Sequence, residues 1–450
     1  MQSTNYSKGK KHAEQIMQKV AYNCKAYKSF LQERQIKLDG LTLNDLPVVD
    51  KDNYIKRYDL KDRLYKRKYI SDHYLICSSS GSMDEPTLWP RSYKYDLGLE
   101  NPHTKFLDEH FQITKKKTLI VIAFALGTTQ AGMMHLKASW EGSAKGKISV
   151  IAPNGNAKTT VFMLDKLHSY YEQVVCIGYP PIISDFIDLA VKRNLKIKKW
   201  NLKIAFASES VSALWRKKTA REIGGKLSDI VSFYGTTEAG MIGFETPRVN
   251  KIVNLCVEND RLRFDLFGTK NLPTLVKVDF EKKLVEIIDG EIVLTVDQPI
   301  PLVRYNVHDI GCLISISEIK KVFNKHNISL KGFHDDDKLL AIYGRNINKT
   351  FTIEDIRDAI EHCQHINLLD KEFQFSEKRI GKKTLLIKVI CYLSNSRKIS
   401  TKETNKIKSE IVSFLKNTIK AKNKEIKLSL TIRDNSHKRG YLYGKTRYLI

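Results

Sequence analysis

Between residues 118 and 233, short apolar runs alternate with segments of helical periodicity. The runs are continuously apolar, as expected for strands that are buried on both faces of a sheet. They cover residues 119–124, 148–152, 174–177, 204–207 and 230–233. Residues 159–171 and 210–223 lie between them and predict helices. This alternation favours an α/β fold with a mostly parallel sheet.

Two further patterns lie outside this region. Residues 12–33 have apolar side chains at helical spacing and predict one N-terminal helix. Residues 285–288 and 291–296 flank Asp289-Gly290, a pair that adopts the positive φ angles of a tight turn, so they predict a β-hairpin.

The acidic run 335–337 predicts a domain boundary in this basic chain. It divides a large N-terminal domain, residues 1–336, from a small α+β domain, residues 337–450. In the second domain the patterns predict a helix over 353–363 and strands over 385–393 and 426–432. A helix that reaches residue 419 begins at Ser400-Thr401-Lys402-Glu403, which has the sequence of a capping box.

Composition narrows the class of protein. The chain has 450 residues, of which 42% are hydrophobic, enough to build a sizeable core, so we do not expect a wholly disordered chain. It carries a formal net charge of +26. The excess charge allows a nucleic-acid partner, but the basic residues are scattered and form no arginine-rich arm, which favours lysines on solvated faces. Nucleic acid is therefore not the expected partner.

Cysteine spacing and hydropathy indicate the cellular compartment in which the protein is expected. The seven cysteines form no Cys-x-x-Cys pair, and no apolar run reaches the ~18 residues of a spanning helix. We expect a cytoplasmic protein with no membrane span.

Two segments have residues suited to bind phosphate. Residues 77–87 combine serine hydroxyls with Gly81, where the backbone can approach phosphate oxygens closely. An ordinary serine-rich turn is the alternative. Residues 234–238, Tyr-Gly-Thr-Thr-Glu, follow a predicted strand, and their hydroxyls and carboxylate suit phosphate and Mg²⁺. The alternative is a strand-to-helix turn in which Glu238 caps the helix.

Two further segments lie toward the C-terminus. Asp309, at the end of a strand-like run, is suited to accept hydrogen bonds from a ribose diol; a surface pair with Arg304 is the alternative. Lys445 stands next to Gly444 in the C-terminal segment and could reach into a cleft; a solvated terminal lysine is the alternative.

Taken together and in this order, these segments resemble the adenylate-forming superfamily, and most of all its phenylacetate-CoA ligase-like branch. The similarity to its phosphate loop is carried by Ser79, Ser80, Gly81, Ser82, Pro86 and Thr87. Its adenine-side segment resembles Ala207, Ser208, Glu209 and Ser210. Its Tyr-Gly-x-Thr-Glu motif is intact as Tyr234, Gly235, Thr236, Thr237 and Glu238, and its arginine-to-aspartate motif as Pro301, Arg304, Tyr305 and Asp309.

The resemblance implies a large adenylation domain and a mobile C-terminal lid domain with the hinge at Asp337. It implies that ATP and Mg²⁺ activate a carboxylic acid as an acyl-adenylate, with release of pyrophosphate. CoA, the pantetheine of an acidic acyl carrier protein, or an amine then accepts the acyl group. Catalytic roles fall to Lys445, Thr237 and Glu238, with Glu238 also the metal ligand. The resemblance implies a substrate pocket lined by Phe124, Gly127, Tyr179 and Gly235. It implies that the other matched residues, including Arg304 and Asp309, bind the nucleotide.

One departure leaves a rival interpretation open. Where the branch has Gly-Lys in its phosphate loop, this chain has Asp84-Glu85, and two carboxylates repel a triphosphate. The rival is a homologue of the same fold that binds a ligand without turnover.

Overall fold

The computed structural model describes residues 5–37, 40–66, 68–73, 75–79, 86–96, 102–144, 146–334, 337–347, 351–352, 356, 359–360, 362–365, 368–379, 384–393, 399–420 and 425–433. Residue contacts divide the chain into two compact units, a large one that ends at Tyr343 and a small one that continues from Gly344. This division falls seven residues after the boundary predicted between residues 336 and 337.

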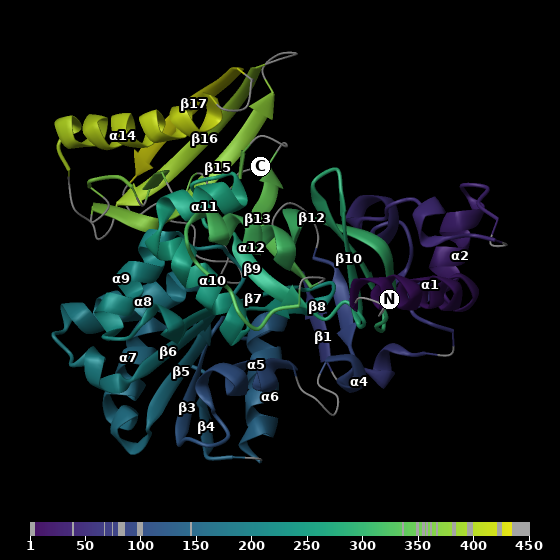
Figure 1. The fold of residues 1–450 in the computed structure, drawn as a ribbon, viewed down its shortest axis with the longest axis horizontal. Helices are drawn as coiled ribbons and strands as arrows, with labels where there is room; N and C mark the ends of the chain where they lie inside the picture. The colour runs from purple at the N-terminus through teal and green to yellow at the C-terminus, as the bar shows by residue number, and fades with distance from the viewer. Residues whose placement is uncertain are drawn as a thin grey trace. The chain divides into compact units, whose positions relative to one another are not determined.

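One mixed sheet runs through the large unit in the order β10-β11-β12-β13-β9-β8-β7-β6-β5-β3-β4 (Figure 1). Its parallel half confirms the α/β prediction, because each buried apolar run forms a strand. These strands are β3 (Thr118–Ala123), β4 (Ile148–Ile151), β5 (Gln173–Gly178), β6 (Leu202–Phe206) and β7 (Ile230–Thr236).

The other half of the sheet is antiparallel where its pairing is described. It contains β8 (Gly240–Phe244), β9 (Thr274–Val278), β10 (Lys283–Ile288), β11 (Glu291–Val296), β12 (Leu302–Ser315) and β13 (Lys338–Ile347). The predicted hairpin is confirmed as β10 and β11, with Asp289 at φ 51° and Gly290 at φ 81°. β14 (Phe351–Thr352) pairs with the end of β13.

Helices cover both faces of the parallel half. In Figure 1, α7, α8 and α9 lie on one side of β3, β5 and β6, and α5 and α6 lie on the other. Their bounds are α5 (Pro102–Phe111), α6 (Gln130–Ser143), α7 (Ala157–Leu167), α8 (Pro180–Lys192) and α9 (Ala213–Ile223). The helices predicted over 159–171 and 210–223 correspond to α7 and α9. Every residue of β3 is fully buried, and residues 119–123 belong to the hydrophobic core that the helices enclose.

The N-terminal segment forms two helices where the sequence predicted one. α1 (Asn5–Asn23) and α2 (Lys25–Gln32) are separated by Cys24, which is extended at φ −117° and forms a β-bridge with Tyr65. The Cys24 thiol donates to the main-chain carbonyl of Arg63 at 3.3 Å, so a long-range contact interrupts the helical pattern. Both helices share a second core with β10, β11 and β12.

A third core covers β9 and β13. It is formed by α10 (Pro247–Glu258), α11 (Asp260–Phe267) and α12 (Ile316–Lys325). Two short strands, β1 (Leu75–Ser78) and β2 (Leu88–Arg91), form a separate antiparallel pair, followed by the short helix α4 (Tyr93–Asp96).

The small unit has its own sheet and core. β15 (Leu369–Arg379) pairs antiparallel with β16 (Thr384–Leu393), which pairs parallel with β17 (Glu425–Arg433). α14 (Thr401–Lys420) packs on this sheet, and its capping box is confirmed by Ser400 Oγ, which donates to Glu403 at 2.7 Å and accepts from its amide at 3.2 Å. β15 is an addition to the predicted elements, and most of the helix predicted over 353–363 lies outside the described residues.

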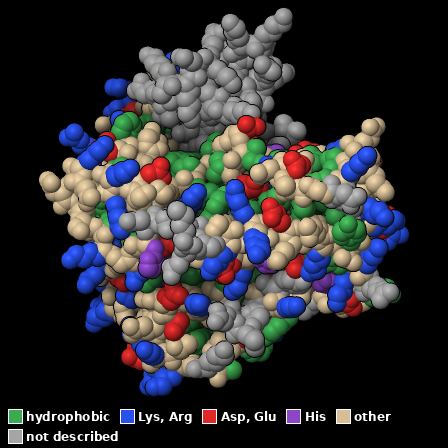
Figure 2. Space-filling view, turned by 45° about the vertical axis from the view of Figure 1, so that its right-hand side comes forward, with side chains coloured by type: hydrophobic (Ala, Val, Ile, Leu, Met, Phe, Trp, Pro, Cys, Tyr) green, Lys and Arg blue, Asp and Glu red, His purple; other side chains and the backbone are tan. Residues whose placement is uncertain are grey.

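Charge is dispersed over the face of the molecule in Figure 2, where Lys and Arg side chains lie at many separate points with Asp and Glu among them. This distribution agrees with the interpretation of scattered lysines on solvated faces. Among the described residues, no helix combines the length and the apolar character needed to cross a membrane.

We predict that Glu245→Ala lowers the free energy of unfolding by about 3 kcal/mol, because it leaves the buried Arg216 guanidinium without its carboxylate. Both side chains are at most 2% exposed, and Glu245 also accepts from Ser232 Oγ at 2.5 Å and from Asn250 Nδ2 at 2.8 Å. The measurement is urea unfolding followed by tryptophan fluorescence.

The matched control is Glu281→Ala, which removes the exposed ion pair with Lys8 and should cost less than about 1 kcal/mol. Equal destabilisation by the two variants would contradict this account of the buried pair.

Candidate functional site

Four parallel strands of the large unit end at one edge of the sheet. In their register Ala123, Gly178, Phe206 and Ser232 lie in one row across β3, β5, β6 and β7. The residues that follow these strands include Phe124, Tyr179, the segment 207–210 and Thr237. The structure therefore brings three of the predicted site segments to the carboxyl edge, where open α/β sheets bind ligands.

The Tyr-Gly-Thr-Thr-Glu segment ends β7 and forms a hairpin turn. Residues 237–239 make the turn and Gly240, at φ 71°, begins β8, while Thr236 Oγ1 accepts from the amide of Ala239 at 3.0 Å. The alternative of a strand-to-helix turn capped by Glu238 is wrong, because the chain returns as an antiparallel strand.

Tyr234 and Asp309 connect two of the predicted segments directly. Tyr234 Oη donates to Asp309 Oδ2 at 2.6 Å, although their strands, β7 and β12, are separated in the sheet by β8, β9 and β13. Asp309 lies inside β12 and not at a strand end as predicted. β12 is irregular there, with register shifts against β11 and a left-handed backbone at Arg304 (φ 48°) and His308 (φ 60°).

Glu238 presents a carboxylate that suits a metal ion. The residue is partly exposed, and within the described part of the chain no hydrogen bond or ion pair engages its side chain. No group of three or more metal-binding side chains occurs among the described residues. One carboxylate together with substrate phosphates and water is a common way of holding Mg²⁺ in proteins.

The predicted adenine-side segment follows β6. Ser208 has a left-handed backbone at φ 77°, a conformation that costs a serine roughly 1 kcal/mol or more and that concentrates at functional sites. Glu209 accepts a hydrogen bond from Tyr179 Oη, and the hydroxyls of Ser210 and Thr274 lie 3.1 Å apart. These contacts join the ends of β5, β6 and β9.

The predicted pocket residues Phe124 and Tyr179 are buried at 4% and 2% exposure. Phe124 stacks on His135, at 5.7 Å between ring centroids, and His135 in turn contacts His103. Burial lowers the pKa of His103 to about 4 and moves the pKa of His135 well below its usual value, so both rings are neutral at pH 7. The two imidazole rings behind Phe124 therefore carry no charge. Gly127 follows with a left-handed backbone at φ 108°.

Of the predicted phosphate loop, Ser79 and Thr87 are described, and Ser80, Gly81 and Ser82 lie outside the described residues. Ser79 Oγ accepts from the Thr87 amide at 3.0 Å and from Thr87 Oγ1 at 2.9 Å. Trp89 Nε1 donates to Thr87 Oγ1 at 3.0 Å. Both hydroxyls are thus engaged with each other where the loop leaves β1 and enters β2.

Arg304 lies apart from the other described site residues. Its Nη1 donates to the main-chain carbonyls of Leu43, Asn44 and Leu46, and its Nε lies 3.6 Å from Glu286. Its predicted role in nucleotide binding stays a prediction, and so does the catalytic role of Lys445, which lies outside the described residues.

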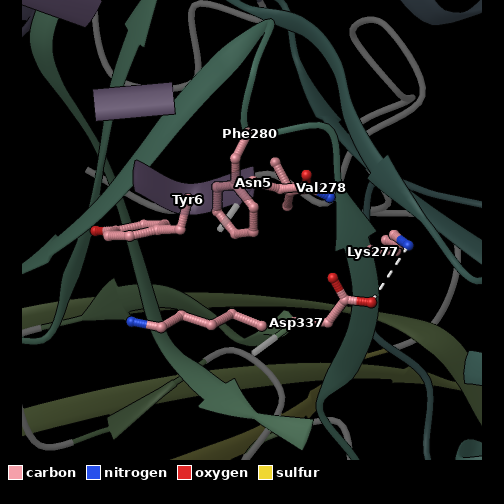
Figure 3. A pocket seen from close by; sticks show the side chains of 7 residues that line it. Asn5, Tyr6, Lys277, Val278, Phe280 and Asp337 are labelled. Atoms are coloured by element: carbon pink, nitrogen blue, oxygen red, sulfur yellow. Dashed lines mark ion pairs between the residues drawn. The ribbon is translucent and has the colours of Figure 1, made fainter. Parts of the chain in front are cut away.

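Asp337, the predicted hinge residue, lies in the large unit directly before β13. Figure 3 shows it beside a small pocket that Asn5, Tyr6, Lys277, Val278, Phe280 and Lys338 also line. The carboxylate of Asp337 lies 3.7 Å from Lys277 Nζ, and the main-chain carbonyl of Asp337 accepts from the Ile316 amide at 2.9 Å. The hinge role stays a prediction.

Sequence reasoning missed the side chains that bind the carbonyl groups of the hairpin turn. Arg91 Nη1 lies 3.4 Å from the carbonyls of Thr237 and Glu238, and Gln298 Nε2 donates to that of Glu238 at 2.6 Å. Lys283 Nζ donates to those of Ala239 and Met241 at 2.7 and 2.6 Å. Gln130, with its amide nitrogen toward the turn, reaches the carbonyls of Thr236 and Thr237. No local pattern marks these residues, which lie in four separate parts of the chain.

Comparison with solved structures identifies the fold. A 2-hydroxyisobutyryl-CoA ligase in the postadenylation state, in complex with 2-HIB-AMP, matches with a TM-score of 0.67 and 14% identity over 98% of this chain and 88% of that one. The GH3.15 acyl acid amido synthetase matches with a TM-score of 0.59 and 14% identity over 100% of this chain and 92% of that one. This chain has the adenylate-forming fold.

The adenylate-forming fold was predicted from the resemblance and is confirmed; the branch within the superfamily stays a prediction. No protein-family sequence model matches the chain, and no curated protein sequence matches it significantly.

We predict that Gly240→Ala destabilises the protein more than Gly290→Ala does. Both glycines have positive φ and therefore incur backbone strain of roughly 1 kcal/mol when replaced. A Cβ at Gly240 would also lie 2.7 Å from Arg91 Nη2, whereas a Cβ at Gly290 would meet nothing within 4 Å. Thermal unfolding of the two variants measures the difference, and equal losses would show that the turn does not depend on its contact with Arg91.

Proposed function

We propose that the chain is a ligase that uses ATP to activate a carboxylic acid as an acyl-adenylate. The observation that carries the proposal is the hydrogen bond from Tyr234 to Asp309. It joins the Tyr-Gly-Thr-Thr-Glu turn to the aspartate expected to bind ribose, 75 residues away in sequence. The adenylate-forming fold supports the same conclusion, because a 2-hydroxyisobutyryl-CoA ligase with this fold binds 2-HIB-AMP.

The first step forms a bond between a carboxylate oxygen of the acid and the α-phosphorus of ATP. The bond from that phosphorus to the oxygen shared with the β-phosphate breaks, and pyrophosphate leaves with the electron pair. Two anions must approach each other, so positioning and charge stabilisation supply most of the rate enhancement. Asp309 orients the ribose by accepting from its hydroxyls, and the hydroxyls of Thr236 and Thr237 donate to phosphate oxygens.

The residues present fit a magnesium ion at Glu238, because its carboxylate is partly exposed and is not engaged by another described side chain. Bound there with the phosphates, Mg²⁺ would draw negative charge from the oxygens of the leaving pyrophosphate. Glu238 is held for this task through its main-chain carbonyl, which accepts from Gln298.

The second step transfers the acyl group and releases AMP. The sulfur of a thiol or the nitrogen of an amine attacks the acyl carbonyl carbon and loses its proton, and the bond from that carbon to the AMP oxygen breaks. The 2-hydroxyisobutyryl-CoA ligase and the GH3.15 acyl acid amido synthetase represent these two outcomes on one fold. We propose CoA as the first acceptor to test, with an acidic carrier protein and amines next.

We predict that Lys445→Ala lowers acid-dependent ATP–pyrophosphate exchange by at least roughly 100-fold. A cation that bridges the carboxylate and the α-phosphate acts only in the transition state of this step, so its loss falls on kcat. The exchange assay uses a panel of aliphatic, hydroxy and aromatic acids. Lys416→Ala, an exposed lysine on α14, is the matched control and should retain wild-type exchange. Unchanged exchange in Lys445→Ala would remove this lysine from the mechanism.

We predict that Glu238→Gln raises the Mg²⁺ concentration required for half-maximal exchange by roughly tenfold, because a neutral amide binds a divalent cation less well than a carboxylate does. The measurement is exchange rate against Mg²⁺ at saturating ATP. A Mg²⁺ dependence identical to that of the wild type would show that the metal is held elsewhere.

The ligand-binding rival rests on Asp84-Glu85 in the phosphate loop. It predicts that the protein binds a nucleotide or an acid in calorimetry while no acid in the panel supports exchange. Exchange with any one acid excludes it.

A further inference from the structure

Side chains from other elements donate hydrogen bonds to the main-chain carbonyl groups of the hairpin turn after β7. Three carbonyl groups of the turn, those of Thr237, Glu238 and Ala239, and that of Met241 on β8 accept hydrogen bonds from other elements. Their donors are Arg91, Lys283 and Gln298, which we call the carbonyl-binding cluster. Carbonyl groups of a surface turn ordinarily face water. Here the hydrogen bonds from the cluster hold the carbonyl groups and so set the orientation of the turn.

Two of the three donors carry positive charge. Arg91 is 2% exposed and paired with Asp96, which is 7% exposed and accepts from Arg91 Nε at 3.1 Å. Lys283 has no such partner, since no described carboxylate lies within 4 Å of its ammonium. Arg91 and Asp96 neutralise each other, whereas Asp96 and Asp279 act on the Lys283 charge without forming an ion pair with it.

The ammonium of Lys283 is held in a desolvated position. Burial, with the neighbouring Arg91 charge, lowers the pKa of Lys283 to about 8. Other charged or titratable groups that act on it are Asp96, Asp279 and Lys282, and it acts on His103, which is already neutral because burial lowers the pKa of His103 to about 4. Desolvation makes the charged form of Lys283 costly, so a further anion at the turn would stabilise it.

The proposed function supplies such an anion. ATP brings several negative charges to the turn, and the predicted phosphate loop offers Asp84-Glu85 in place of a lysine. A cation is therefore needed from another part of the chain.

We propose that Lys283, together with Arg91 and Gln298, is a positioning residue of the nucleotide site: its hydrogen bonds hold the turn that presents Thr236, Thr237 and Glu238, and its charge favours binding of the triphosphate. This inference rests on the proposed function. It assigns to β10 a role in nucleotide affinity that no motif of the sequence indicates.

The test measures the affinity for ATP with Mg²⁺ by calorimetry, together with KM and kcat of pyrophosphate exchange, from pH 7 to 9.5. Wild-type affinity should fall roughly tenfold as the pH rises through about 8, because Lys283 then loses its charge. Lys283→Arg should keep the pH 7 affinity up to pH 9.5. Lys283→Met should bind at every pH roughly tenfold more weakly than the wild type does at pH 7, and should match the wild type at pH 9.5, with the loss mainly in KM.

Lys282→Met is the matched control, because it removes an exposed lysine one position earlier on the same strand entry. It should keep the wild-type affinity at pH 7, and its fall in affinity should move to a slightly higher pH, because the charge of Lys282 lowers the pKa of Lys283. If Lys283→Met fails to fold, the contrast between wild type and Lys283→Arg still decides the question.

The outcomes separate this inference from the function on which it rests. Suppose that the wild type binds ATP and catalyses exchange. If Lys283→Arg then shows the same pH profile as the wild type, or if folded Lys283→Met has an unchanged KM, only the role of Lys283 is overturned. Absence of both ATP binding and exchange in the wild type would overturn the proposed function, and this inference with it.

Discussion

The hairpin turn at residues 237–240 is the constraint on which the candidate site depends. It is the point at which the sheet changes from its parallel half to its antiparallel half, so the chain must reverse without a crossover helix. Gly240 permits the reversal through its left-handed backbone and through the close approach of Arg91. Because the turn stands at the carboxyl edge of the parallel strands, its geometry also sets where Thr237 and Glu238 face.

Around this turn, distant parts of the chain converge with complementary chemistry. Asp309 and Glu238 supply carboxylates. Tyr234 donates to Asp309, whereas no described side chain engages Glu238. Arg91 and Lys283 bring positive charge to the main-chain carbonyls of the turn. Two carboxylates that can bind ribose and metal, together with two cations at the turn, suit a polyanion that binds with a divalent metal.

Local signals predicted much of this structure, and long-range contacts account for what they missed. The hairpin at Asp289-Gly290 and the buried parallel strands were predictable, because a turn pair and continuous apolar runs act over a few residues. The break at Cys24 was not, since it depends on contacts with the segment around Arg63. The carbonyl-binding cluster was invisible for the same reason, whereas the motifs around Thr237 and Asp309 were recognisable because each is contiguous in sequence.

The most direct measurement is a crystal structure of the protein with AMP bound. The account predicts the ribose hydroxyls within hydrogen-bonding distance of Asp309 and the phosphate beside the Thr236 and Thr237 hydroxyls, at the carboxyl edge of β7. AMP bound elsewhere, or a ribose that makes no contact with Asp309, would contradict the assignment of this edge as the nucleotide site.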